Sequence, residues 1–261
     1  MVFLLAIIFF LFGTIIGSFL NVVIYRLNTN KSFGGRSACM SCQNQLQWYE
    51  LIPLFSFLTL KGRCRTCRTK ISIQYPIVEF ISGLVFTALF LKFQDLFFID
   101  TYGFFIAYDY YAVMFSILLV IAVYDLKHKI IPDTLVFIFG ALAFIGLFFF
   151  HTPDIFNFLS GVFIALPFAL FWLVSGGRWM GLGDAKLALG LGWLLGLPLA
   201  FSGLVLAFWS GAIVGIFLII LSKIRKKGKL GMKSEIPFAP FLVLGAVLAF
   251  ICELNIFPPS F

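Results

Sequence analysis

Long apolar runs separated by short polar stretches are the feature that most restricts how this chain can fold. Eight such runs can be drawn, and an α-helix needs about 20 apolar residues to cross a bilayer. Runs such as Phe148-Phe149-Phe150 leave no polar face, which is typical of helices surrounded by lipid. We therefore expect an all-α polytopic membrane protein with about eight transmembrane helices. The expected crossings are residues 3–25, 76–94, 107–124, 134–150, 157–175, 186–201, 203–222 and 237–256.

The composition excludes a soluble domain. Of the 261 residues, 62% are hydrophobic and 11% are charged, and the mean hydropathy is +1.07. A water-soluble domain of this length needs more polar surface than that. A β-barrel is disfavoured as well, because its strands would alternate over segments of roughly ten residues. Membrane lipid is therefore the expected surroundings of most of the chain.

The basic residues indicate an orientation in the membrane. The formal charge is +8, but no nucleic-acid partner is expected, because an excess of Lys and Arg also sets membrane topology. If the N-terminus lies outside, the inner loops hold 18 of the 19 Lys and Arg residues. These loops are residues 26–75, 125–133, 176–186 and 223–236. Positive-inside bias therefore favours an outside N-terminus.

The first inner loop carries two Cys-x-x-Cys pairs, Cys39 with Cys42 and Cys64 with Cys67. This spacing is typical of a structural zinc site with four cysteine ligands. Free thiols and two disulfides are the alternatives, although disulfides are disfavoured in a cytoplasmic loop. The fifth cysteine, Cys252, stands alone in the last apolar run and is expected to be a small core residue.

Two acidic residues lie at the ends of expected crossings. Asp125 ends the third and Asp184 precedes the sixth, and two complete crossings between them return both to the same face. Charges near transmembrane helices are costly, which makes each a functional candidate, and two converging carboxylates can share one proton. Gly181 and Gly183 allow a tight turn before Asp184. Capping of the sixth crossing by Asp184, and an ion pair of Asp125 with Lys127 or Lys129, remain the alternative roles, and Asp133 is expected to be a cap.

At these residues the chain resembles the prepilin leader peptidase/N-methyltransferase family, the type IV prepilin peptidases of the GxGD aspartic membrane proteases. The similarity runs over nearly the full length and rests on an ordered set of motifs. Besides the cysteine pairs and Asp125, these are Gly17–Leu27, Trp48–Pro53, Gly62–Cys67, Tyr75–Glu79, Ile131–Asp133, Gly181–Asp184 and Ile236–Phe241.

The resemblance implies an aspartic endopeptidase of the bacterial cytoplasmic membrane, with its active site facing the cytoplasm. Such an enzyme removes the short basic leader from prepilin or pseudopilin precursors and methylates the new N-terminal amine with S-adenosylmethionine. The acid pair of the family maps onto Asp125 and Asp184. Zinc binding by the cysteine loop is also implied, and that loop is associated with methylation.

Three segments follow from this interpretation: a first transmembrane helix (1–25), a cytoplasmic four-cysteine loop (26–75) and a transmembrane bundle with the peptidase site (76–261). Glu79, near the cytoplasmic start of the second crossing, is a candidate for binding the substrate amine. An ion pair with an arginine of the loop is the alternative role for Glu79.

The competing hypothesis is an ion- or proton-coupled membrane transporter, because many-span proteins with acidic residues often move ions. A carrier should place its acids near the middle of the bilayer, beside interrupted helices. Asp125 and Asp184 are instead expected at the membrane boundary, which favours the peptidase.

Overall fold

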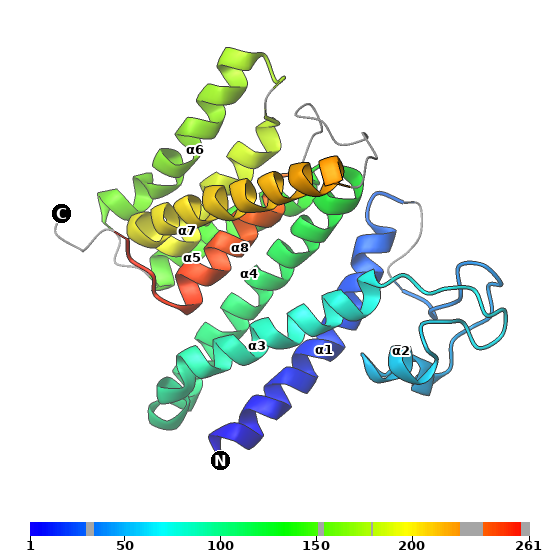
Figure 1. The fold of residues 1–261 in the computed structure, drawn as a ribbon. Coiled ribbons are helices and arrows are strands. Elements are labelled where there is room, and N and C mark those ends of the chain that lie inside the picture. Colours follow the sequence, from blue (N-terminus) through cyan, green and yellow to red (C-terminus); the bar gives the residue numbers. More distant parts are fainter. Residues whose placement is uncertain (30–33, 151–153, 179, 225–236, 257–261) are drawn as a thin grey trace. The chain divides into compact units, whose positions relative to one another are not determined.

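Helices make up nearly all of the regular structure in the computed structural model, which describes residues 1–29, 34–150, 154–178, 180–224 and 237–256 (Figure 1). Within these ranges, β pairing is confined to two isolated bridges, Ala38 with Gln45 and Arg63 with Lys70. The long helices are α1 (Val2–Arg26), α3 (Gln74–Ile99), α4 (Thr101–His128), α5 (Asp133–Phe150), α6 (Ile155–Ser175), α7 (Leu182–Ile224) and α8 (Ala239–Ile251). A 3-10 helix, η1 (Trp48–Leu51), and the short α2 (Phe55–Thr59) lie between α1 and α3. The expected all-α membrane fold is confirmed.

Six helices in the described part of the chain are long and apolar enough to cross a membrane. They are Val2–Arg26, Gln74–Ile99, Thr101–His128, Asp133–Phe150, Ile155–Ser175 and Leu197–Ser222. The expected eighth crossing corresponds to α8, which at 13 residues is shorter than the about 20 needed to span. The expected inner loop 223–236 lies almost wholly outside the described residues.

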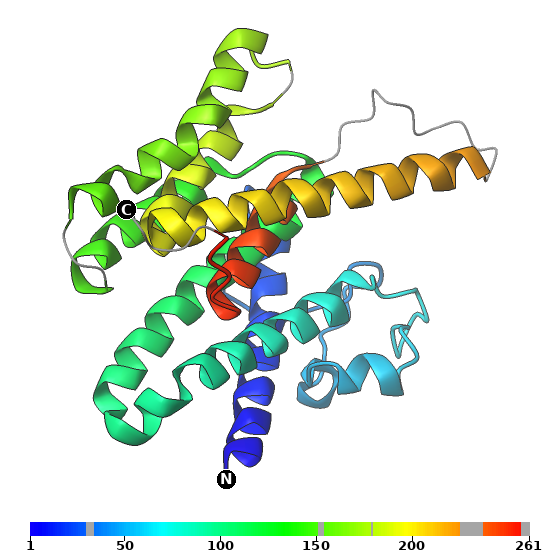
Figure 2. The ribbon, with the colours of Figure 1, turned by 60° about the vertical axis from the view of Figure 1, so that its left-hand side comes forward.

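The expected boundary between the sixth and seventh crossings, at residue 202, is wrong. Residues 182–224 form one helical element, and its break falls earlier, at Gly196, where φ is 72°. Figure 2 shows the change of direction between the two parts of α7. The part before Gly196 is too short for a full crossing. Glycine at the break supplies the positive φ, and the following Pro198 lacks the N–H that would continue the ladder.

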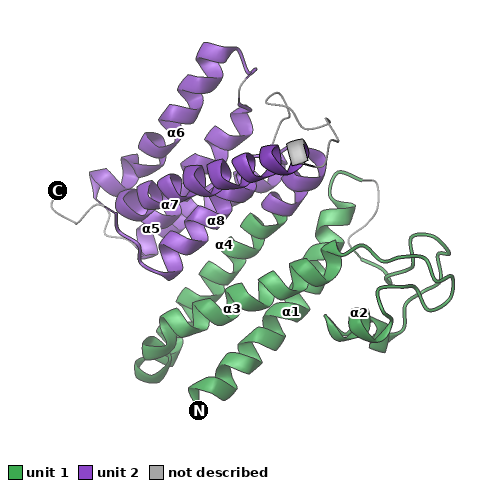
Figure 3. Ribbon diagram, in the orientation of Figure 1, with its two compact units in different colours: residues 1–120 green, residues 121–261 purple. Residues whose placement is uncertain are grey.

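The chain divides into two compact units, residues 1–120 and 121–261, with the boundary inside α4 (Figure 3). In the first unit α1 packs along α3, and in the second α7 packs against α5, α6 and α8. Glycines permit the close approach of α1 and α3. A Cβ on Gly17 would lie 2.8 Å from the Cα of Glu79, so no larger residue fits there without a shift.

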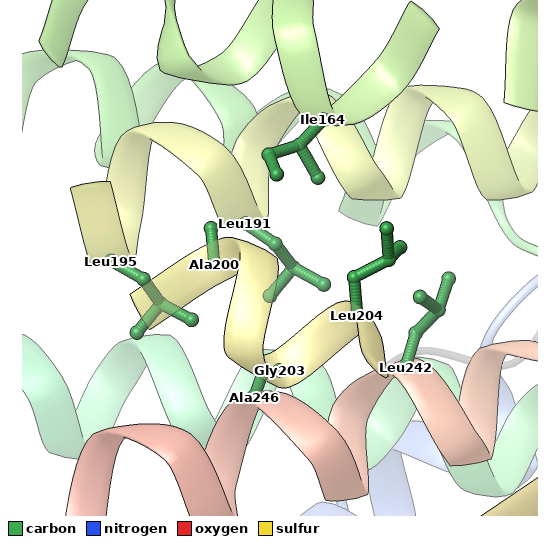
Figure 4. A pocket seen from close by; sticks show the side chains of 8 residues that line it. All are labelled: Ile164, Leu191, Leu195, Ala200, Gly203, Leu204, Leu242 and Ala246. Carbon is green, nitrogen blue, oxygen red and sulfur yellow. The ribbon is translucent and has the colours of Figure 1, made fainter. Parts of the chain in front are cut away.

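The contact between α7 and α8 is equally close. A Cβ on Gly245 would collide with the carbonyl oxygen of Gly203, and would lie 2.9 Å from the backbone nitrogen of Ala207. Beside this contact lies an apolar cavity of about 10 Å³, lined by side chains of α6, α7 and α8 (Figure 4). A cavity of this size has room for about one water molecule, and its apolar lining gives a water few partners.

We expect Gly245→Ala to lower the stability of the protein by about 1–3 kcal/mol, because the added methyl group meets rigid helix backbone. Thermal unfolding of the purified protein in detergent measures the change. Gly140→Ala on α5 is the matched control, since among the described residues a Cβ there would meet no neighbour within 4 Å beyond the backbone of its own helix. Equal unfolding temperatures for the two variants would contradict the close contact.

Candidate functional site

The two candidate catalytic aspartates occupy opposite ends of their helices within the second unit. Asp125 lies in the last turn of α4, and Asp184 lies in the first turn of α7. Both are buried, with 4% and 8% of their surface exposed, which is unusual for carboxylates. They also lie close enough for the charge of Asp125 to act on Asp184. The structure therefore brings together the two aspartates that the sequence singled out.

The backbone around Asp184 depends on only one of the two glycines before it. A Cβ on Gly183 would lie 3.0 Å from the Cβ of Ile131, so the glycine lets the segment between α4 and α5 pass close to α7. Within the described part of the chain, a Cβ on Gly181 would approach only the backbone nitrogen of Gly183, at 3.9 Å. Gly181 instead contributes its carbonyl oxygen, which accepts the N–H of Asp184 at 3.3 Å.

The polar partners of the two carboxyl groups differ. The backbone N–H of Ala239, the first residue of α8, donates a hydrogen bond to Asp125. Among the described residues, Oδ1 of Asp184 is buried and has no hydrogen-bond partner. Burial, together with the negative charge of nearby Asp125, raises the pKa of Asp184 to about 7. Asp184 is therefore partly protonated at neutral pH, and in that form the pair offers one carboxyl able to donate and one carboxylate able to accept.

Lys186, only two residues after Asp184, forms an ion pair with Asp133 at the start of α5. Its Nζ donates to Oδ1 of Asp133 at 2.7 Å and also lies 5.1 Å from the centre of the Phe137 ring. This contact gives the Ile131-Pro132-Asp133 motif a role that the sequence did not reveal. The ion pair links α5 to α7 next to Asp184. Lys186, the basic residue nearest to Asp184 in the sequence, is thus paired with Asp133.

The four loop cysteines converge in the first unit. Their sulfur atoms all lie within 4.8 Å of one another, with 3.7 Å between Cys39 and Cys67 and 4.0 Å between Cys42 and Cys64. Four thiolates bound at about 2.3 Å in a tetrahedron would stand about 3.8 Å apart. The observed spacing therefore fits a single tetrahedrally coordinated metal ion, and the cluster is able to hold one.

Each cysteine pair sits on the same kind of turn. In the first, Gln43 donates its N–H to the carbonyl of Cys39 at 2.9 Å, and in the second Arg68 donates to Cys64 at 3.0 Å. Gln43 and Arg68 both have positive φ, 55° and 56°. One isolated β-bridge closes each turn. Two matching turns of this kind present two sulfur atoms each, as the paired spacing predicts.

Hydrogen bonds lower the pKa of two of the four thiols, which favours their thiolate forms. The Thr69 hydroxyl and backbone N–H lower the pKa of Cys67 to about 6, and the backbone N–H groups of Cys42 and Ser41 lower the pKa of Cys39. The N–H of Asn44 lowers the pKa of Cys42, but desolvation and the three other thiols outweigh it and raise the pKa to about 11. A bound cation would relieve this mutual repulsion of thiolates.

Glu79 is buried in α3, with 7% of its surface exposed. Its Oε2 accepts the backbone N–H of Leu54 at 2.8 Å, and the Ser18 side chain also forms a hydrogen bond with it. The sequence had suggested binding of a substrate amine, or an ion pair with an arginine of the loop. Among the described residues, the partners of Glu79 are the Leu54 N–H and Ser18, and none is an arginine of the loop. No pattern in the sequence pointed to Leu54.

Fold and site together define a polytopic membrane protein with a buried aspartate pair at helix ends and a separate four-thiol cluster. Residues 11–93 match the model of the bacterial peptidase A24 N-terminal domain, and residues 112–220 match that of the type IV leader peptidase family. The chain belongs to the type IV leader peptidase family. This confirms the resemblance noted in the sequence.

Curated relatives support the same assignment over most of the chain. The prepilin leader peptidase/N-methyltransferase of Myxococcus xanthus is 36% identical over 89% of this chain and 67% of its own length. Proteins of the same name from Bacillus subtilis and Pectobacterium carotovorum are 30% and 32% identical, covering 94% and 92% of this chain and 93% and 90% of their own lengths. No solved structure matches the chain.

We expect the purified protein to contain about one transition-metal ion per chain, and Cys64→Ser to lose most of it, because a closed four-ligand site cannot spare a ligand. Elemental analysis by plasma mass spectrometry measures the metal. Cys252→Ser is the matched control and should keep the metal, because Cys252 is a free cysteine outside the cluster and is exposed, so the expectation that it lies in the core was wrong. Wild-type metal content in Cys64→Ser would exclude the site.

Proposed function

We propose that this protein removes the short basic leader from prepilin or pseudopilin precursors, with Asp125 and Asp184 as the catalytic pair, and then N-methylates the new N-terminus. The observation that carries the proposal is the buried aspartate pair in a chain of the leader peptidase family. Its relatives bear the name prepilin leader peptidase/N-methyltransferase. Membership of this family and the membrane-spanning helices support a multi-pass protein of the bacterial inner membrane.

Peptide hydrolysis by such a pair needs one proton between two carboxyl groups. The ionised carboxylate takes a proton from water, and the water oxygen attacks the scissile carbonyl carbon. The protonated partner donates a hydrogen bond to the carbonyl oxygen, where negative charge develops. When the C–N bond breaks, a proton passes to the leaving amine, and the pair returns to its starting state. The elevated pKa of Asp184 supports this assignment, because a pKa of about 7 leaves the necessary proton on a large share of the molecules at neutral pH.

The position of the pair at helix ends suits the substrate class. A precursor with a basic leader before an apolar helix would keep its leader in water while its helix lies among transmembrane helices. The scissile peptide then falls at the membrane boundary. The 12 Lys and Arg residues in the loops 26–75, 125–133 and 176–186, all of which precede the break in α7, support an N-terminus outside and a peptidase site facing the cytoplasm. A transporter would be expected to carry its acids at mid-membrane depth, so the helix-end position favours the peptidase.

We assign the second activity, methyl transfer from S-adenosylmethionine, to the four-cysteine segment. Its tetrahedral thiol set suits zinc in a structural role, which would fold a segment that has few buried residues of its own. Cys39, Cys42, Cys64 and Cys67 would hold the ion. Binding of the substrate amine by Glu79 stays a prediction. The proposed division of the chain is 1–25, 26–75 and 76–261.

We expect Asp125→Asn and Asp184→Asn each to reduce leader cleavage at least about 100-fold, because an amide can neither activate water nor supply the proton. Mass spectrometry of a prepilin incubated with the purified protein measures cleavage. Asp154→Asn is the control, since Asp154 caps α6 and asparagine caps equally well. Cleavage at the wild-type rate by a folded Asp184→Asn protein would rule out the pair.

The rate of cleavage should fall as the pH rises above about 7. Asp184 is protonated below its raised pKa of about 7 and loses that proton above it, which leaves two carboxylates and no acid. The measurement is kcat/KM for prepilin cleavage from about pH 6 to about pH 9. Recovery of the rate on return to neutral pH controls for unfolding. A flat profile across this range would contradict the shared proton.

A further inference from the structure

Glu79 connects three segments of the first unit. It belongs to α3, it hydrogen-bonds the side chain of Ser18 on α1, and it accepts the N–H of Leu54 in the cysteine-bearing segment at 2.8 Å. A charged group with so little exposed surface is normally fully engaged in hydrogen bonds. The carboxylate is thus built into the junction between the helix pair and the loop.

The backbone at Leu54 is strained. Its φ and ψ are 59° and −48°, and Phe55 donates its N–H to the carbonyl of Pro53 at 2.6 Å. This is a γ-turn of the rare, strained kind centred on a residue with a large side chain. Such a conformation persists only where its surroundings hold it. The bond from the Leu54 N–H to Glu79 lies at the centre of that turn.

The residues before the strained turn form one wall of a groove. The groove has a volume of about 480 Å³ and separates α1 from the segment 48–53, which is within the range of ligand sites. Ser18, the α1 partner of Glu79, lines it, and Trp48, Leu51, Ile52 and Pro53 form the opposite wall. Glu79 therefore holds the end of that wall while contacting the other side of the groove through Ser18.

We propose that Glu79 is a positioning residue for methylation. By accepting the Leu54 N–H it stabilises the turn at Leu54, and so it holds the wall 48–53 of the groove at its distance from α1. The inference rests on the proposed methyltransferase activity of this segment. It replaces the predicted binding of the substrate amine by Glu79 with a role through hydrogen bonding and shape, and not through charge. Leader cleavage, which we assign to aspartates of the second unit, does not depend on it.

Two substitutions separate shape from charge. Glu79→Gln keeps the length and an oxygen that accepts the Leu54 N–H, but it loses the charge. Glu79→Asp keeps the charge, but it draws the carboxylate back by one methylene group, away from that N–H. Asp95→Asn, an exposed acid further along α3, is the control for removing a charge from the same helix.

The first measurement is hydrogen exchange of the Leu54 amide in the full-length protein in detergent, read by mass spectrometry. Glu79→Asp should exchange this amide about tenfold faster than wild type, because the N–H loses its buried acceptor. Glu79→Gln and Asp95→Asn should match wild type. Unchanged protection in Glu79→Asp would overturn the proposal without any reference to enzyme activity.

The second measurement is the mass of the products of a prepilin with S-adenosylmethionine. Glu79→Asp should lower kcat/KM for methylation about tenfold and Glu79→Gln should restore it, while leader cleavage stays at the wild-type rate in both. Loss of methylation in Glu79→Gln with a protected Leu54 amide would show instead that the charge is required. If the wild-type protein adds no methyl group, the proposed methyltransferase activity is wrong. The exchange experiment then still tests whether Glu79 holds the turn at Leu54.

Discussion

The absence of water from the membrane interior is the constraint on which the rest of this structure depends. Each backbone N–H and carbonyl in that region must find a partner within the chain, and a helix provides one for every residue except those at its ends. Helices therefore account for nearly all the regular structure in the described residues. Polar chemistry is left to the helix ends, and the candidate carboxylates lie at the end of α4 and the start of α7.

Apolar helices in lipid gain no hydrophobic free energy by pairing, so their association depends on close van der Waals contact. Small residues are needed at the interface because they let the two backbones approach. Gly17 lets α1 reach α3, and Gly203 with Gly245 lets α7 reach α8. The second of these contacts also has a consequence for the site. The backbone N–H at the start of α8 donates to Asp125, so the packing of α8 against α7 contributes to the surroundings of the carboxylate pair.

The loop between α1 and α3 follows a different logic. It has few buried residues and is organised instead by two matching turns that bring four sulfur atoms within 4.8 Å. Its attachment to the helices is also polar, through the buried carboxylate of Glu79. The conformation of such a segment is stabilised by metal coordination and hydrogen bonds, whereas the helical part of the chain is stabilised by side-chain packing. This contrast suits our assignment of separate activities to the two parts.

The sequence by itself determined the helical membrane fold, the positions of most long helices, the family and the four-cysteine cluster. These features depend on local patterns, namely apolar run length and the spacing of Cys-x-x-Cys pairs. The sequence placed the break in α7 too late, because a single Gly196 with positive φ is not distinguishable from other glycines in an apolar run. Tertiary structure alone decided the Lys186–Asp133 ion pair, the contact of Ala239 with Asp125, and the bond between Glu79 and Leu54. Each joins residues far apart in the chain, and their contact depends on how the helices pack, which no local pattern records.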